Sequence, residues 1–132
     1  MIAADANLVV RYLLHDDPRQ TAIAQRVFGE AEARGEPIFI GHLVLCEVCW
    51  ALASSYRLGK AAIVIALQAL LDDRAFLLQD RQLVERALGH YKRGGAGFSD
   101  YLIGEVAREE GATVTLTFDR RLARARGFAL AT

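Results

Sequence analysis

Residues 1–15 read M-I-A-A-D-A-N-L-V-V-R-Y-L-L-H, and this stretch decides the fold class. The apolar run Ile2–Ala4 predicts a short buried strand, and a helix is expected from about Asn7 to Leu14. Asp5 lies between the two. Ligands of α/β sheets bind in the crevice beyond the carboxyl ends of the strands, so Asp5 is a candidate site residue.

The rest of the chain continues the alternation of strands and helices. After Asp16-Asp17-Pro18, which suits a helix start, we expect a helix that ends at Gly35. No internal repeat, low-complexity tract or linker interrupts the pattern, and Gly94–Gly97 predicts a flexible loop. The alternation favours an α/β sandwich with a central, mainly parallel sheet. The further helices are expected over about 42–56, 60–72, 82–91 and 99–110, and the further strands over about 37–41, 75–78, 113–117 and 128–130.

Length and composition indicate one well-packed domain, residues 1–132. A chain of 132 residues buries about two-thirds of its unfolded surface. Hydrophobic residues make up 53% and there are two prolines, which predicts a compact core rather than disorder. Lys+Arg and Asp+Glu number 16 each, so net charge alone does not attract nucleic acid over long range. A local basic face is still compatible with these totals.

The apolar segments and the cysteines predict a protein of the cytoplasm. The first apolar run meets Asp5 almost at once, so no signal peptide is expected. The longest apolar stretch, Ala61–Leu71, is interrupted by Gln68 and is shorter than the ~20 residues that span a bilayer. Cys46 and Cys49 form a single C-x-x-C inside a predicted helix. They cannot make a four-thiolate zinc site within one chain, and we interpret them as small buried side chains.

Four acidic residues each interrupt or end an apolar stretch, and they are spread over the whole chain. A carboxylate in such surroundings loses hydration, which costs several kcal/mol unless a partner compensates. Four carboxylates in one pocket would repel one another and take up protons, and a divalent cation is the simplest remedy. Oxygen ligands favour Mg²⁺ or Mn²⁺. The residues are Asp5 in I-A-A-D-A-N, Glu47 in L-V-L-C-E-V-C-W, Asp100 in G-F-S-D-Y-L-I and Asp119 in T-L-T-F-D-R-R.

Each of these residues also has an ordinary structural interpretation. Asp5 could cap the helix that follows it, Asp100 could do the same beside Ser99, and Asp119 could cap a short helix near residues 120–124. Glu47 lies within a helix that is apolar all round, which predicts burial and a partner. The structural alternative for Glu47 is an ion pair with an arginine such as Arg57 or Arg11.

Together the four acidic segments resemble the motifs of PIN-domain proteins, in the family's order and spacing. The opening M-I-A-A-D-A-N-L-V-V-R-Y-L-L-H-D-D-P-R-Q-T-A-I-A is similar to the family's first strand and helices. The helices with L-V-L-C-E-V and F-S-D-Y-L-I-G-E-V-A, and the segment T-L-T-F-D-R-R-L, match the rest. The resemblance spans essentially the whole chain and, at this size, is greatest to the VapC toxins of bacterial type II toxin–antitoxin pairs.

This resemblance implies a Mg²⁺- or Mn²⁺-dependent endoribonuclease that acts as the growth-inhibiting toxin of a VapBC-type pair. By family pattern Asp5, Glu47, Asp100 and Asp119 hold the metal and activate a water for attack on a phosphodiester. Asn7 would orient Asp5 or the site water, and Thr117 matches a family hydroxyl position; local backbone capping is the alternative for both. The resemblance also implies a homodimer, a VapB-type antitoxin, and a heterotetramer or larger complex of the two. Basic residues flank the acidic segments and suit phosphate contacts, or only a solvated face: Lys92, Arg93, Arg120, Arg121, Arg124 and Arg126.

The sequence departs from the family pattern in two places. Ala6 stands where relatives carry Thr or Ser, and His42 begins the Glu47 helix where many relatives place a small hydroxyl residue, so His42 is expected to be a surface residue or a substitute cap. A phosphoacceptor receiver domain would need a Lys-Pro near its end, and a haloacid-dehalogenase-type phosphatase would need an Asp in place of Asn7. The main alternative is a catalytically inactive PIN-fold module that binds RNA or protein.

Overall fold

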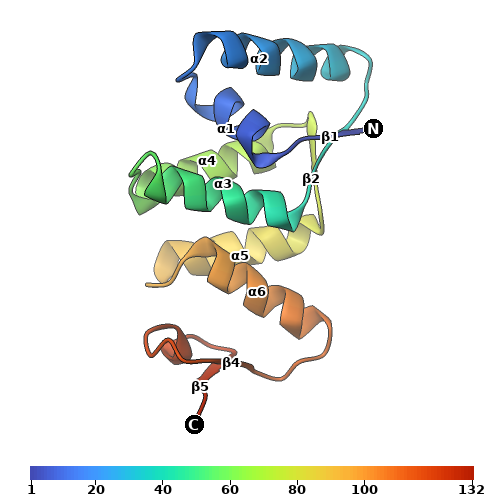
Figure 1. Cartoon of the computed structure of the whole chain (residues 1–132). Helices are drawn as coiled ribbons and strands as arrows, with labels where there is room; N and C mark the ends of the chain where they lie inside the picture. Colours follow the sequence, from blue (N-terminus) through green and yellow to red (C-terminus); the bar gives the residue numbers. More distant parts are fainter. The chain divides into compact units, whose positions relative to one another are not determined.

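Parallel strands and the helices between them build the first part of the chain, Met1–Arg81, which we call unit 1 (Figure 1). The computed structural model describes every residue from Met1 to Thr132, and Gln82–Thr132 forms a second compact part, unit 2. The sheet of unit 1 has the order β1-β2-β3, with both pairs parallel. Its strands are β1 (Ile2–Ala3), β2 (Ile38–Ile40) and β3 (Phe76–Leu78).

Four helices accompany this sheet, and side-chain caps fix where two of them begin. Helix α1 (Ala6–Leu14) starts at Asp5, and α2 (Pro18–Ala33) starts at Asp17, whose side chain accepts from the Gln20 amide. Helix α1 packs against α2 and α3, and α3 packs against α4 (Figure 1). The two further helices are α3 (His42–Ser54) and α4 (Lys60–Asp72).

The core of unit 1 joins the strands to the buried faces of the helices. Tyr12, Phe28 and Phe76, from α1, α2 and β3, meet edge to face with ring centroids 5.0–5.6 Å apart. Such aromatic contacts stabilise a core beyond the area that they bury. Strand β2 is central, and the side chains of Ile38 and Ile40 are fully buried.

Unit 2 contains two helices and a second, smaller parallel sheet. Its elements are α5 (Arg81–Arg93, which begins at the boundary), α6 (Phe98–Glu109), β4 (Thr115–Thr117), the 3₁₀ helix η1 (Leu122–Arg124) and β5 (Phe128–Leu130). Strand β4 pairs with β5, with Thr115 opposite Phe128. Phe98 and Tyr91 pack edge to face between α6 and α5, with centroids 6.3 Å apart. The Phe128 ring lies so close to Gly104 of α6 that a Cβ there would stand 2.5 Å from it.

The sequence predicted every helix and strand that the structure contains, with ends that differ by a few residues. The range of α4 is as predicted, whereas α3 ends at Ser54 rather than Tyr56 and β4 begins at Thr115 rather than Thr113. The α/β class with parallel sheets is confirmed. The parallel strands, however, form two sheets and not the one central sheet that was expected. Strands β1, β2 and β3 pair in unit 1, and β4 pairs with β5 in unit 2. None of the helices has the length and apolar character needed to cross a membrane.

Candidate functional site

Asp5 follows β1 directly and caps α1. Its Oδ1 accepts a hydrogen bond from the Leu8 amide at 3.0 Å, and its extended backbone suits an N-cap. The capping interpretation is therefore confirmed. The cap uses only Oδ1, and the Asp5 side chain is exposed, so Oδ2 is available to a ligand.

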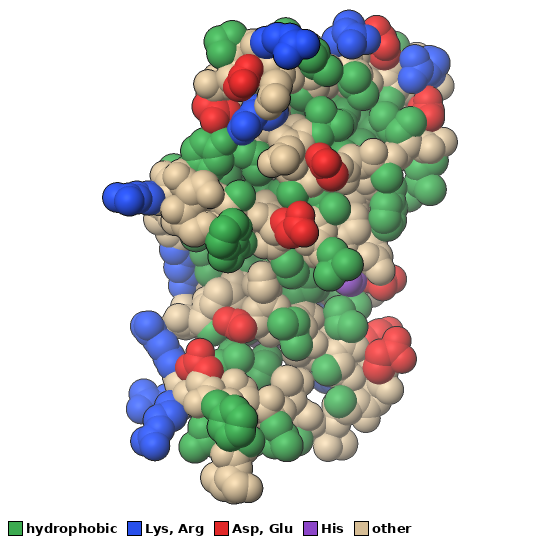
Figure 2. Space-filling view, viewed as in Figure 1, with side chains coloured by type: hydrophobic (Ala, Val, Ile, Leu, Met, Phe, Trp, Pro, Cys, Tyr) green, Lys and Arg blue, Asp and Glu red, His purple; other side chains and the backbone are tan.

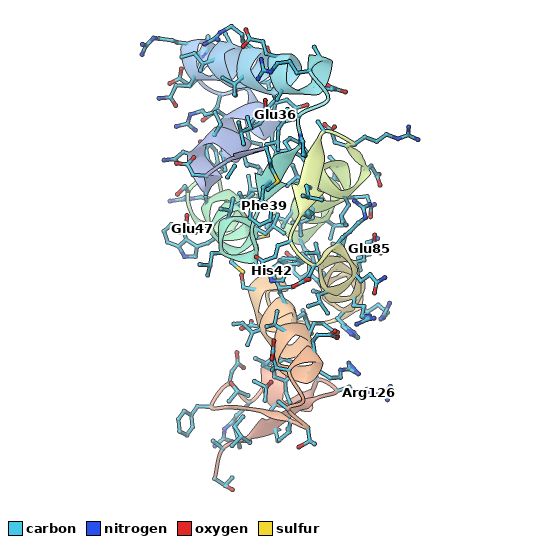
Figure 3. All side chains as sticks on the ribbon, turned by 90° about the vertical axis from the view of Figure 1, so that its right-hand side faces the viewer. Glu36, Phe39, His42, Glu47, Glu85 and Arg126 are labelled. Carbon is cyan, nitrogen blue, oxygen red and sulfur yellow. The ribbon has the colours of Figure 1, made fainter.

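Glu47 differs from the prediction, because its side chain is exposed and not buried. The buried face of α3 is formed by Leu45, Val48, Cys49 and Leu52, and Glu47 lies on the other face. Leu43 and Trp50 share that other face and are 82% and 70% exposed. Figure 2 shows a carboxylate among hydrophobic side chains over α3, and Figure 3 labels Glu47 on this helix.

The alternative for Glu47, an ion pair with an arginine such as Arg57 or Arg11, is also not observed. Arg11 instead pairs with Asp16, at 3.4 Å. The prediction that Glu47 is buried was wrong. An apolar helix in a small unit needs only one buried face, and the large side chains on its other face can stay at the surface. Both carboxylate oxygens of Glu47 are thus open to solvent or a ligand.

Asp100 lies in the first turn of α6. Its Oδ2 accepts from the Gly97 amide at 3.1 Å, which closes the turn that leads from the glycine-rich loop into the helix. The aromatic neighbours Phe98 and Tyr101 are buried in unit 2, so they belong to the core rather than to a stacking surface. Asp100 is half-buried and its Oδ1 has no protein partner.

Thr117 is the last residue of β4, and Asp119 lies two residues beyond it. Asp119 Oδ1 accepts from the amides of Arg121 and Leu122, at 2.9 and 3.1 Å, and so caps η1. Thr117 Oγ1 accepts from the Asp119 amide at 3.0 Å, which is the backbone-capping alternative for this residue. The threonine thereby fixes the direction in which the Asp119 carboxylate leaves the strand.

The three aspartates therefore share one arrangement. Each sits just past a strand or in a first helical turn, uses one oxygen to cap the backbone and keeps the other oxygen free. A carboxylate at a helix start also interacts favourably with the backbone amides there. Asp5 and Glu47 belong to unit 1, and Asp100 and Asp119 to unit 2. Neither unit by itself groups three or more His, Cys, Asp or Glu side chains in a metal-holding arrangement.

A surface pocket of unit 1 begins at Asp5. It has a volume of about 230 Å³ and is lined by Asp5, Asn7, Leu8, Arg11, Gln20 and Ile23. Asn7 is exposed and shares this pocket with Asp5, as its predicted orienting role requires. The pocket thus brings two of the predicted site residues together beside a guanidinium.

Arg11 is held in this pocket by a hydrogen-bonded network. Its Nε donates to Gln20 Oε1 at 2.6 Å and its Nη1 donates to the Tyr56 hydroxyl at 2.6 Å. The Tyr56 hydroxyl in turn donates to Asp16 Oδ2 at 2.7 Å. That hydrogen bond, followed by a backbone hydrogen bond and then by the nearby Arg11 charge, lowers the pKa of Asp16, and the same bond from Tyr56 raises the pKa of Tyr56.

His42 is anchored at the start of α3, and Gln79 caps that helix. The Gln79 Oε1 accepts from the His42 amide at 2.9 Å, while His42 Nε2 lies 2.7 Å from the Gln79 carbonyl oxygen and donates to it. His42 is half-buried, and its backbone amide and its ring are both hydrogen-bonded to Gln79. Sequence reasoning did not identify Gln79 as the cap of α3.

The cysteines are free thiols on α3. Cys49 is buried, and burial, with a smaller contribution from nearby Cys46, raises its pKa to about 12. The interpretation as a small buried side chain is confirmed for Cys49, whereas Cys46 is only half-buried.

The buried, partnered glutamate of this protein is Glu105, which sequence reasoning missed. It is 5% exposed, on the face of α6 that also carries Phe98, Tyr101 and Leu102. His90 Nε2 and Arg108 Nη2 donate to its Oε1 at 3.0 and 3.3 Å. The signal was its spacing, since residue 105 continues the i, i+3, i+4, i+7 series of the buried face.

The comparisons with known proteins agree with the acidic motifs. The model of the family described as PIN domain matches residues 2–127, which includes both units. A VapC ribonuclease of Aquifex aeolicus (strain VF5) is 23% identical over 117 residues, covering 89% of this chain and 86% of the relative. Because the family match spans nearly the whole chain and all four acidic segments, this protein belongs to the PIN-domain family.

Proposed function

We propose that this protein is a metal-dependent endoribonuclease and the toxin of a VapBC-type toxin–antitoxin pair. The observation that carries the proposal is that all four carboxylates of the family pattern are present and each has an oxygen free to bind a ligand. The similarity to a VapC ribonuclease supports RNA as the substrate. We also propose that both units form one PIN domain, residues 1–132, since the family match spans both.

The donor chemistry of these residues fits a hard divalent cation. Free carboxylate oxygens are the ligands that Mg²⁺ and Mn²⁺ prefer. We propose that Asp5, Glu47, Asp100 and Asp119 hold the metal or metals. A bound cation of this kind lowers the pKa of a water and neutralises charge on a phosphate.

The residues of the chain itself have separate tasks in this proposal. The backbone caps hold the carboxylates of Asp5, Asp100 and Asp119 in fixed orientations, so little ordering is needed when substrate binds. Asn7, beside Asp5 in the same pocket, orients that carboxylate or the attacking water. Thr117 positions Asp119 through its backbone amide. Arg120, Arg121 and Arg124 are exposed around the Asp119 turn and suit contacts with RNA phosphates.

The toxin assignment implies partners, and α3 offers a surface for them. Leu43 and Trp50 are large apolar side chains that lie exposed on one face of this helix. Exposed apolar residues of this size are typical of protein interfaces. They support the proposals of a homodimer and of a VapB-type antitoxin that binds it in a heterotetramer or larger complex, in the cytoplasm where its RNA substrate would be.

Amide variants test the catalytic proposal without removing the caps. Asp100→Asn keeps an oxygen that can accept from the Gly97 amide but loses the charge. We expect RNA cleavage in Mg²⁺ or Mn²⁺ that EDTA abolishes and that Asp100→Asn reduces by about 100-fold or more. Asp72→Asn, an exposed aspartate whose carboxylate accepts from Gln68 in α4, is the matched control. Cleavage that is indifferent to EDTA or to Asp100→Asn would rule out the mechanism and favour the inactive binding module.

Growth inhibition tests the toxin proposal. Expression of the wild-type chain should arrest a bacterial host, and Asp5→Asn, which keeps the α1 cap, should relieve the arrest. A variant that stays as toxic as the wild type at equal abundance would contradict the assignment. Mapping the RNA ends that arise soon after induction would identify the target.

A further inference from the structure

Unit 2 contains a cavity that the proposed metal site does not use. Its volume is about 270 Å³, and its walls come from one face of α6, the end of α5 and the segments that precede β4 and β5. On α6 it exposes Tyr101, Gly104, Glu105 and Arg108, which recur at helical spacing. Asp100 and Asp119 are not among the lining residues.

Glu105 lines this cavity and has one carboxylate oxygen that its ion pairs do not use. Both of its ion pairs, with His90 and Arg108, use Oε1. No buried side-chain oxygen in the molecule lacks a partner, so Oε2 must be reached by solvent. Glu105 is 5% exposed and lines both this cavity and the smaller pocket beside it, and these are the two routes by which a ligand could reach Oε2.

The charges around the cavity exclude a simple cation as its ligand. Arg108 already neutralises Glu105, and Arg126 is an exposed guanidinium on the rim that extends outward in Figure 3. Arg86 and Glu109, from the neighbouring smaller pocket that Glu105 also lines, offset one another. The lining thus has a net positive charge. This favours a ligand that carries an anionic group for the arginines and a neutral N–H donor for Glu105.

The walls favour a flat, partly apolar ligand. The half-buried Phe128 ring lines the cavity and lies against the backbone of Gly104. Aromatic side chains of this kind stack on nucleobases, and a carboxylate accepts from an exocyclic amino group such as that of cytosine. The volume is somewhat below that of pockets for drug-sized ligands, which suits one base rather than a larger molecule.

We propose that this cavity binds a nucleotide whose base carries an exocyclic amino group, with Glu105 Oε2 as the acceptor and Arg126 at the phosphate. The base comes either from an unstacked residue of the RNA substrate or from a free nucleotide. As an RNA subsite it rests on the proposed nuclease function. Uracil fits less well, because its N3–H lies between two carbonyl oxygens that the carboxylate repels.

Direct binding tests the proposal independently of cleavage. Calorimetric titration of the full chain with AMP, CMP and UMP should give an affinity for AMP or CMP about tenfold or more above that for UMP. Glu105→Leu should bring these affinities together. Arg126→Ala should weaken all three by a similar factor, and Arg19→Ala, an exposed arginine of α2, should change none.

The outcomes separate this inference from the nuclease proposal. Equal affinity for the three nucleotides, or a preference that survives Glu105→Leu in a folded protein, would overturn it even if the protein cleaves RNA. If Glu105→Leu does not fold, NMR of the wild type replaces the comparison with this variant. AMP, but not UMP, should then shift the resonances of His90 and Tyr101.

A second arm identifies the source of the base. Short single-stranded RNA made only of adenosine or only of uridine is titrated into the Asp100→Asn variant, which keeps the α6 cap. The same preference in these RNAs assigns the cavity to the substrate strand, and a preference confined to mononucleotides assigns it to a free nucleotide.

Discussion

Helices α3 and α6 each carry a glutamate within an apolar run, and the structure treats the two residues in opposite ways. Glu47 of α3 is exposed without an ion pair, whereas Glu105 of α6 is buried between His90 and Arg108. A carboxylate that nothing in the protein neutralises is available for an external ligand. One that is neutralised internally stabilises the fold through that ion pair, so the contrast predicts that a change of Glu47 lowers activity and a change of Glu105 lowers stability.

The largest expected effect is on Glu47. Glu47→Gln should reduce RNA cleavage by about 100-fold or more and leave the free energy of unfolding within about 0.5 kcal/mol of the wild type. Single-turnover cleavage and urea unfolding measure the two quantities. Glu32→Gln, an exposed glutamate of α2, should change neither. Full activity in Glu47→Gln would break the comparison, because the unpaired glutamate would then have no catalytic use.

The converse is expected for Glu105. Glu105→Ala should lower the free energy of unfolding by about 1–2 kcal/mol, since two charge-assisted hydrogen bonds and buried volume are lost. The cost stays moderate because the side chains of His90 and Arg108 remain 36% and 58% exposed and can be hydrated. Chemical denaturation measures it. An unchanged unfolding midpoint would show that the buried pair contributes nothing.

A smaller, pH-dependent effect is expected from the exposed carboxylate Asp16. Its lowered pKa, caused first by the Tyr56 hydroxyl, means that this contribution to stability is present above the ordinary value of about 3.9. It is lost as pH falls through the lower value in the folded protein. Tyr56→Phe should therefore destabilise the protein more at about pH 7 than at about pH 3. Urea titrations of both proteins at each pH are the measurement, and an equal difference at both would refute the linkage.

The smallest effect on stability is expected at Trp50. Trp50→Ser should change the free energy of unfolding by less than about 0.5 kcal/mol, because the side chain is 70% exposed. Leu52→Ala, on the fully buried face of the same helix, should unfold at clearly lower denaturant concentration. Light scattering of Trp50→Ser tests the partner proposal, and a loss of self-association would identify α3 as an interface.

The sequence alone determined the order and class of the elements and the four acidic positions. These depend on local signals: apolar periodicity, Gly and Pro at the ends of elements, and carboxylates beside strand ends. It also offered local capping as the alternative role of Asp119 and Thr117, because capping joins residues only two or three apart.

Only the tertiary structure decided which face of each helix is buried and which polar groups meet across the chain. Glu47 has the more apolar neighbours in sequence, yet packing placed Glu47 at the surface and Glu105 against α5. The Gln79 cap on α3 joins residues 37 positions apart. Such contacts have no local signature, since their energy depends on distances that a linear pattern does not contain.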